Sequence, residues 1–216
     1  MDLKEISNFI TSSAKSLNIK KWDFGASFSN DFSVQVDKGI AKQLKASQKQ
    51  VLTLRVWNKK NLVGITTTSD LSENGLKKAL YQANLASDYG NKNELTDFSP
   101  LAKDPIKDIK QAKRSPAGIK KLLETLRFAE SELLKKHSAI KTIPYNGLSE
   151  SFYKRIYANS EGAQRSYAKS QAAIYLYARA EENNRKPRSS GSVKIGYGLE
   201  DIDINSCIDE AAEKTI

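Results

Sequence analysis

Only one histidine, His137, is available to bind a catalytic metal in this sequence of 216 residues. A zinc hydrolase needs two histidines one helical turn apart, so that both imidazoles reach one metal, and a carboxylate that activates the bound water. His137 is followed by Ser-Ala-Ile and ends a lysine-rich helical pattern, where the helix dipole favours a cation. The sequence therefore predicts no catalytic and no metal-binding residue, and we expect no metal catalysis by this chain alone.

Other residue types that could do chemistry also lack suitable partners. Cys207 shares the apolar face of a helical pattern, so we expect a packed thiol rather than a nucleophile. Gly191 and Gly196 have the spacing of a phosphate-binding loop, but Tyr197-Gly198 stands where Lys-Ser/Thr is required. Glu181-Glu182 are adjacent on a strand end, so their side chains point apart. The sequence predicts no cofactor-binding residue.

The clearest structural elements lie between Val51 and Leu85. Residues 51–57 alternate between apolar and polar side chains, which is typical of a half-buried strand. After a polar turn, residues 62–68 are rich in β-branched side chains and predict a return strand. Ser72 then suits the N-cap of an amphipathic helix. We therefore expect a hairpin that leads into a capped helix.

The first part of the sequence has the same mixed character. Apolar residues at helical spacing predict an opening helix over residues 2–17. Alternation predicts further strands at residues 22–28, 32–36 and 40–47. Asn30-Asp31 are typical of a turn between the first two of these strands, and Gly39 suits a tight turn that requires positive φ.

The remaining sequence predicts a second subdomain. A stretch rich in proline and lysine leads to Ser115-Pro116, which is expected to open a helix that ends near His137. Strands follow from Ile140, with a hairpin loop at residues 159–162, and a last helix is capped by Asp203 or Asn205.

Together these patterns predict an α+β fold with two subdomains, each a mostly antiparallel sheet with flanking helices. We expect the first domain at residues 1–88, a long Pro/Lys-rich linker at 89–116 and the second domain at 117–216.

Several stretches resemble the TldD/PmbA family. Arg55 on a strand, a basic turn, Gly64 and then Thr-Thr-Ser-Asp-Leu-Ser at residues 67–72 before a helix are similar to the first domain of its PmbA (TldE) branch. Residues 157–162, Tyr-Ala-Asn-Ser-Glu-Gly, and 180–183, Ala-Glu-Glu-Asn, are similar to the family's second, central domain.

The resemblance implies a non-catalytic subunit or fragment of a metalloprotease complex. Such a chain would shape a cavity for unfolded peptides and bind a TldD-like catalytic subunit or associate with itself. Zinc is expected only in that catalytic partner, because the His-Glu-x-x-x-His motif of the catalytic branch is absent here. Candidate contacts to peptide or partner are Lys59, Lys60, Ser69 and Asp70, although Ser69 and Asp70 could instead serve only to begin a helix.

The family's last domain, which would carry that motif, is absent as well. We therefore expect a truncated chain, with an apolar seam near residues 204–216 that drives self-association.

The formal net charge of +10 allows an alternative function, a basic module that binds nucleic acid or a DNA-gyrase-type partner. The family's older label, modulator of DNA gyrase, fits that alternative. However, the lysines are scattered and few aromatic residues are interleaved with them, so nucleic acid is not favoured as a partner. A single cysteine, no visible secretory signal and no apolar run near the roughly 20 residues that cross a bilayer indicate a cytoplasmic protein without membrane contact.

Overall fold

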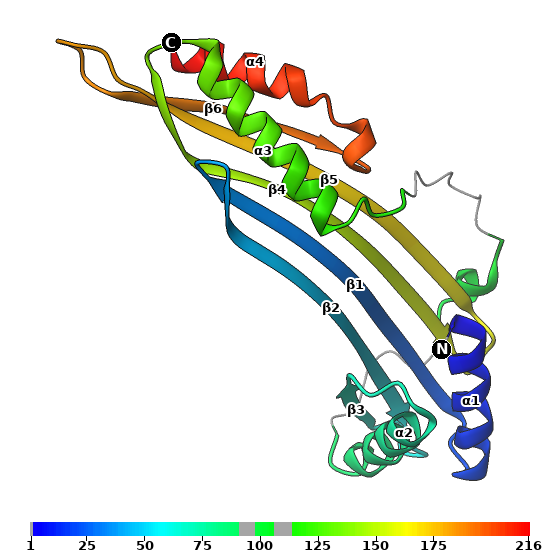
Figure 1. Ribbon diagram of the computed structural model, residues 1–216. Helices are drawn as coiled ribbons and strands as arrows, with labels where there is room; N and C mark the ends of the chain where they lie inside the picture. The colour runs from blue at the N-terminus through cyan, green and yellow to red at the C-terminus, as the bar shows by residue number, and fades with distance from the viewer. Residues whose placement is uncertain (1, 91–97, 106–113) are drawn as a thin grey trace. The chain divides into compact units, whose positions relative to one another are not determined.

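The computed structural model describes residues 2–90, 98–105 and 114–216 (Figure 1). Its elements, in chain order, are α1 (Leu3–Ser16), β1 (Lys21–Asp37), β2 (Ile40–Trp57), β3 (Val63–Thr68), α2 (Glu73–Ser87), η1 (Pro100–Lys103), α3 (Ile119–Lys136), β4 (Ile140–Asn159), β5 (Gln164–Ala180), β6 (Arg188–Gly196), η2 (Leu199–Asp201) and α4 (Ile204–Thr215). The strands form a six-stranded sheet in the order β3-β2-β1-β4-β5-β6. The predicted α+β class is confirmed.

The chain divides into two compact units that each combine several separate segments. Unit 1 consists of Met1–Phe28, Lys49–Lys110 and Lys154–Ala168. Unit 2 consists of Ser29–Gln48, Gln111–Tyr153 and Lys169–Ile216. The four long strands β1, β2, β4 and β5 each contribute residues to both units.

Unit 1 has a core between its strands and the helices α1 and α2. The largest buried side chains of this core come from all of these elements: Ile6, Ile10, Trp22, Phe24, Leu52, Leu54, Leu76 and Leu80. The local signals of the sequence act as expected, because the Ser72 hydroxyl accepts the Gly75 N–H at 3.1 Å and caps α2. Gly64 of β3 lies against α2 so closely that an added Cβ would stand 1.9 Å from the Ala83 carbonyl oxygen.

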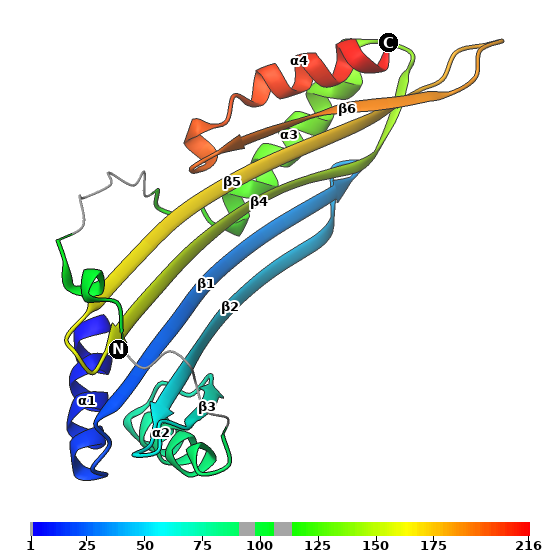
Figure 2. The same cartoon turned by 180° about the vertical axis from the view of Figure 1, so that it is seen from behind.

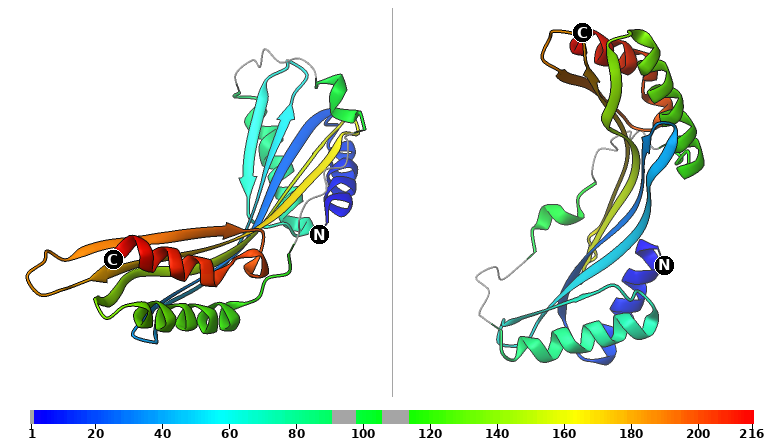
Figure 3. Two further views of the ribbon diagram at one scale, coloured as in Figure 1. Left: turned by 90° about the horizontal axis from the view of Figure 1, so that it is seen from above. Right: turned by 60° about the vertical axis from the view of Figure 1, so that its left-hand side comes forward.

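Unit 2 has a separate core, in which α3 and α4 cover one face of the sheet (Figure 3). Leu122, Leu126 and Leu133 of α3 are fully buried with Leu148 of β4 and Ile174 of β5. The reverse view in Figure 2 shows the unit 2 parts of β5 and β6 in front of α3. The apolar face of α3 and the inward-facing side chains of the strands therefore pack together in one apolar layer.

Two buried polar side chains organise the strands of unit 2. Glu130 of α3 accepts the backbone N–H of Lys38 at 3.0 Å and that of Gly39 at 2.6 Å, so the helix holds the turn between β1 and β2. Asn146 of β4 accepts the Val36 N–H at 2.9 Å and donates to the Val36 carbonyl at 2.9 Å. Its amide thus joins β4 to β1 through two hydrogen bonds to the Val36 backbone.

The strands are longer than the sequence predicts. Asn30 and Asp31 lie inside β1 and form no turn, and β2 joins the two strands predicted at 40–47 and 51–57. Because β1 lies between β2 and β4 in the sheet, strand pairing on both sides overrides the local turn preference. The predicted helix start at Pro116 is also wrong, since α3 begins at Ile119 after Gly118, whose φ is 83°.

Residues 91–97 and 106–113 of the expected linker lie outside the described residues. None of the helices in the described ranges has the length and apolar character required to span a bilayer.

Candidate functional site

Three polar side chains form a hydrogen-bonded cluster on the strands of unit 1, on the face opposite its apolar core. Asp23 of β1, Arg55 of β2 and Tyr157 of β4 each alternate with buried apolar neighbours, so their side chains point away from that core. The Arg55 Nε donates to Asp23 Oδ1 at 2.8 Å, and its Nη2 donates to Oδ2. The Tyr157 hydroxyl donates to Asp23 Oδ2 at 3.3 Å. Asp23 is only 2% exposed, and both of its carboxylate oxygens accept hydrogen bonds from these two partners.

Aromatic rings and a second cation adjoin this cluster. The Arg55 guanidinium lies over the Trp57 ring, 5.2 Å from its centroid, and the Lys21 ammonium lies 5.5 Å from the same ring. Phe98 meets Trp57 edge to face at 5.5 Å. The indole N–H of Trp57 is buried and has no hydrogen-bond acceptor among the described residues. The cluster thus combines a buried carboxylate and a buried indole ring with a guanidinium that reaches the surface.

The protonation states of the cluster favour recognition over acid–base chemistry. The hydrogen bond to Asp23 raises the pKa of Arg55, which keeps the guanidinium charged. Burial, followed by the charge of Asp23, raises the pKa of Tyr157, so the phenol stays protonated at neutral pH. The Arg55 side chain is still 41% exposed. It can therefore present donors to a carbonyl or carboxylate oxygen, whereas neither Arg55 nor Tyr157 is poised to exchange a proton.

The four contacts predicted from the sequence lie elsewhere in unit 1. Lys59 and Lys60 are exposed in the turn before β3, and Ser69 and Asp70 are exposed just after β3 ends. Asp70 Oδ1 accepts the Ser72 N–H at 2.9 Å, and hydrogen bonds from Ser72 lower the pKa of Asp70. The structure thus places the two pairs at opposite ends of the six-residue strand β3. Their role in binding stays a prediction.

Sequence reasoning noted Arg55 and Tyr157 but missed the cluster that they form. Both residues occur in the stretches that carry the family resemblance, whereas the sequence patterns predicted no role for Asp23, Lys21 or Phe98. One signal was available, namely an aspartate in the middle of an alternating apolar strand, which requires a partner once the strand is buried. Which residue pairs with this aspartate depends on the register between strands. Asp23 and Tyr157 lie more than a hundred residues apart in the sequence, so local patterns do not show that they meet.

The other residues considered for chemistry have structural roles. His137 caps the end of α3, and its Nδ1 accepts the Ala139 N–H at 3.1 Å. Cys207 is fully buried in the unit 2 core, which confirms a packed thiol, and burial raises its pKa. Glu181 pairs with Arg179, and Glu182 pairs with Arg188 at 2.9 Å.

Unit 2 contains a small hollow of about 10 Å³, room for a single water molecule, and the buried carboxylate of Glu150 beside it is already hydrogen-bonded. Glu150 Oε2 accepts the Ala117 N–H at 2.8 Å, and its Oε1 accepts the Leu199 N–H at 3.2 Å. Arg114 on the rim of the hollow pairs with Asp201 at 2.8 Å. These groups hold loops in place, and their hydrogen-bonding atoms are largely paired within the protein.

Comparison with known proteins gives one family and several structures. Residues 112–216 match the family described as the PmbA/TldA metallopeptidase central domain. The chain is similar in structure to a candidate modulator of a DNA gyrase from Thermotoga maritima MSB8, with a TM-score of 0.80 and 16% identity over 99% of this chain and 48% of that one. It is similar to TldE from Thermococcus kodakarensis, with a TM-score of 0.78 and 15% identity over 97% of this chain and 46% of that one.

A candidate modulator of DNA gyrase from Bacteroides thetaiotaomicron VPI-5482 is also similar, with a TM-score of 0.77 and 12% identity over 98% of this chain and 49% of that one. No curated protein sequence matches the chain. At these identities the solved structures establish the fold alone, and the chain spans about half the length of each of them.

Proposed function

Since the chain belongs to the PmbA/TldD family, we propose that it is a PmbA/TldE-like, non-catalytic subunit or fragment of a cytoplasmic metallopeptidase complex. It would shape a cavity for unfolded peptides and bind a zinc-bearing, TldD-like partner. One observation carries this proposal. The family's central domain occurs here in a sequence with a single histidine, whereas the resemblance places two histidines in the catalytic motif.

The polar cluster of unit 1 supports a role in holding an extended chain. A peptide in extended conformation exposes backbone carbonyl oxygens, which the half-exposed Arg55 guanidinium can bind. The partly exposed ring of Phe98, which packs edge to face on the buried Trp57, adds apolar surface beside that donor. Such contacts depend little on peptide sequence, as binding of varied unfolded substrates requires.

The proposal is tested with the purified chain and a zinc-bearing TldD-type subunit, each alone and both mixed. The readouts are zinc content by mass spectrometry and cleavage of an unstructured peptide. We expect the chain alone to hold no stoichiometric zinc and to cleave nothing, and the mixture to cleave faster than the zinc-bearing subunit alone. Peptide cleavage by this chain alone, with one zinc bound per chain, would refute the proposal.

The predicted contact residues can be tested in the same mixture. Replacing Lys59 and Lys60 by glutamate is expected to weaken partner or peptide binding at least about threefold, since each exposed charge pair contributes up to about 1 kcal/mol. The matched control replaces Lys15 and Lys77, exposed lysines of α1 and α2 in the same unit, by glutamate. Equal losses in both variants would show that only the net charge matters.

A second candidate function follows from the charge of +10 and from the names of two matched structures, which describe candidate modulators of DNA gyrase. In that case the chain would bind a nucleic-acid duplex or a DNA-gyrase-type enzyme. Titration of a fluorescent duplex at two salt concentrations distinguishes the candidates. Micromolar binding that weakens steeply with salt favours the second function, and weak binding at both concentrations favours the first.

A further inference from the structure

The outer edge of β2 is unpaired over most of its length. Strand β3 pairs with β2 only from Leu52 to Trp57, and no other described strand lies on that side. Within unit 2, the edge runs from Ile40 to Gln48, and every residue from Lys42 to Gln48 is exposed. A strand edge of this length presents a row of backbone N–H and C=O groups that another strand can pair with.

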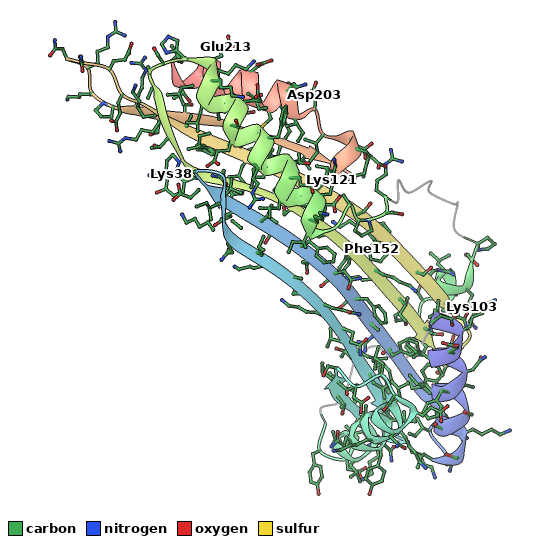
Figure 4. The ribbon with its side chains drawn as sticks, in the orientation of Figure 1. Lys38, Lys103, Lys121, Phe152, Asp203 and Glu213 are labelled. Carbon is green, nitrogen blue, oxygen red and sulfur yellow. The ribbon has the colours of Figure 1, made fainter. Side chains whose placement is uncertain are left out.

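The turn that precedes this edge is fixed in place by a helix of unit 2. Lys38 and Gly39 form a two-residue turn with φ values of 51° and 74°, a geometry that matches the twist of paired strands. The buried carboxylate of Glu130 accepts both of their N–H groups, so α3 fixes the turn from which β2 starts. Lys38 is labelled in Figure 4 at this end of the hairpin. A preorganised edge loses less conformational freedom when it binds another strand.

The charge of the edge indicates which chain can pair with it. Lys38, Lys42 and Lys45 lie on or beside this edge, and the sequence has no aspartate or glutamate between Lys38 and Ser69. A second copy of the chain would bring these lysines close to one another, and like charges opposite each other destabilise a strand pair. An acidic strand would instead place a carboxylate near each lysine.

We propose that the β2 edge from Ile40 to Gln48 binds an extended, acidic polypeptide segment by strand addition. Backbone hydrogen bonds to the edge would supply affinity without regard to sequence, and the lysines would select for acidic segments. The inference is independent of the proposed function, because it requires neither the zinc-bearing partner nor cleavage.

The test uses three fluorescent ten-residue probes, which are added to the whole chain in an anisotropy titration. The first alternates glutamate with threonine and valine, the second has lysine in place of glutamate, and the third is the acidic probe with two central prolines. We expect saturable binding of the first probe only, weakening as salt rises. Hydrogen exchange should slow at backbone amides between Ile40 and Gln48 when the first probe is bound.

Two variants locate the site. Lys42→Glu with Lys45→Glu is expected to weaken binding of the acidic probe at least about tenfold, since attraction is replaced by repulsion at two positions. Lys120→Glu with Lys186→Glu changes the charge equally at exposed lysines outside β2 and should leave binding unchanged. Equal binding of the proline probe, unchanged exchange at the edge, or equal effects of both variants would overturn the proposal. So would displacement of the probe by an equally charged single-stranded DNA, or formation of a dimer through this edge.

Discussion

Replacing Glu130 by glutamine is the most direct test of how unit 2 holds its hairpin. Glu130 is 4% exposed and accepts two backbone N–H groups, at 3.0 Å and 2.6 Å. A hydrogen bond to a charged group contributes about 1.5–3 kcal/mol. Glutamine keeps one acceptor oxygen and places an amide N–H where the second acceptor stood. One such bond is lost, and the smaller desolvation cost of the neutral side chain offsets part of that loss.

We therefore expect Glu130→Gln to lower the free energy of unfolding by about 2 kcal/mol, which corresponds to a Tm decrease of roughly 4–8 °C in a chain of this size. The assay is urea and thermal unfolding followed by far-UV circular dichroism, with hydrogen exchange at Lys38 and Gly39 as the local readout. Exchange at both amides should accelerate, because each loses its charged acceptor.

The matched control is Glu132→Gln on the same helix. Glu132 pairs with Lys135, one helical turn away, and both side chains are exposed. Such a pair contributes about 0.3–0.5 kcal/mol. Equal destabilisation by the two substitutions, or unchanged exchange at Lys38 and Gly39 in Glu130→Gln, would show that the buried carboxylate does not hold the turn.

Three further predictions follow from single contacts. Gly64→Ala should destabilise unit 1 by about 2–3 kcal/mol, because the added Cβ meets the backbone of α2. The control is Gly25→Ala, whose added Cβ has no neighbouring atom within 4 Å. It should change stability by less than about 0.5 kcal/mol in the same urea unfolding assay. Asp23→Asn should cost about 2 kcal/mol, less than the roughly 3–5 kcal/mol of a fully buried pair because the Arg55 side chain is 41% exposed, and a double-mutant cycle with Arg55 measures the coupling. Hydrogen bonds from lysines and Ser192 lower the pKa of Glu210 from 4.5 to about 2. The stability that this carboxylate contributes is therefore present above pH 4.5 and is lost as the pH falls toward 2. Glu210→Gln should flatten the dependence of Tm on pH in this window, and an unchanged slope would contradict the prediction.

Short-range features of the fold could be predicted because the residues that decide them are neighbours in the sequence. The N-caps Ser72 and Asp203 accept N–H groups three residues on, and Gly39 adopts the positive φ that its tight turn was expected to need. The lengths of the strands could not be predicted. Asn30 and Asp31 are turn residues by local preference, and only the partners on either side of β1 keep the chain extended there.

The candidate site could be predicted only in part, for the same reason. Arg55 and Tyr157 occur in stretches that resemble the family, but the carboxylate that joins them belongs to a third strand, 32 residues from Arg55 and 134 from Tyr157. Register between non-adjacent strands decides which outward-facing side chains meet, and a shift by one residue would separate them. Lys59, Lys60, Ser69 and Asp70 stay predictions that the binding experiments address.

Both tryptophans of the sequence, Trp22 and Trp57, belong to unit 1. Intrinsic tryptophan emission therefore monitors unfolding of that unit, whereas the circular dichroism of the backbone monitors both. If the long strands make the two units melt as one cooperative block, the two optical signals will trace a single superimposable curve. If the curves separate, each unit possesses its own melting transition, and the chain carries a built-in spectroscopic label for one of them.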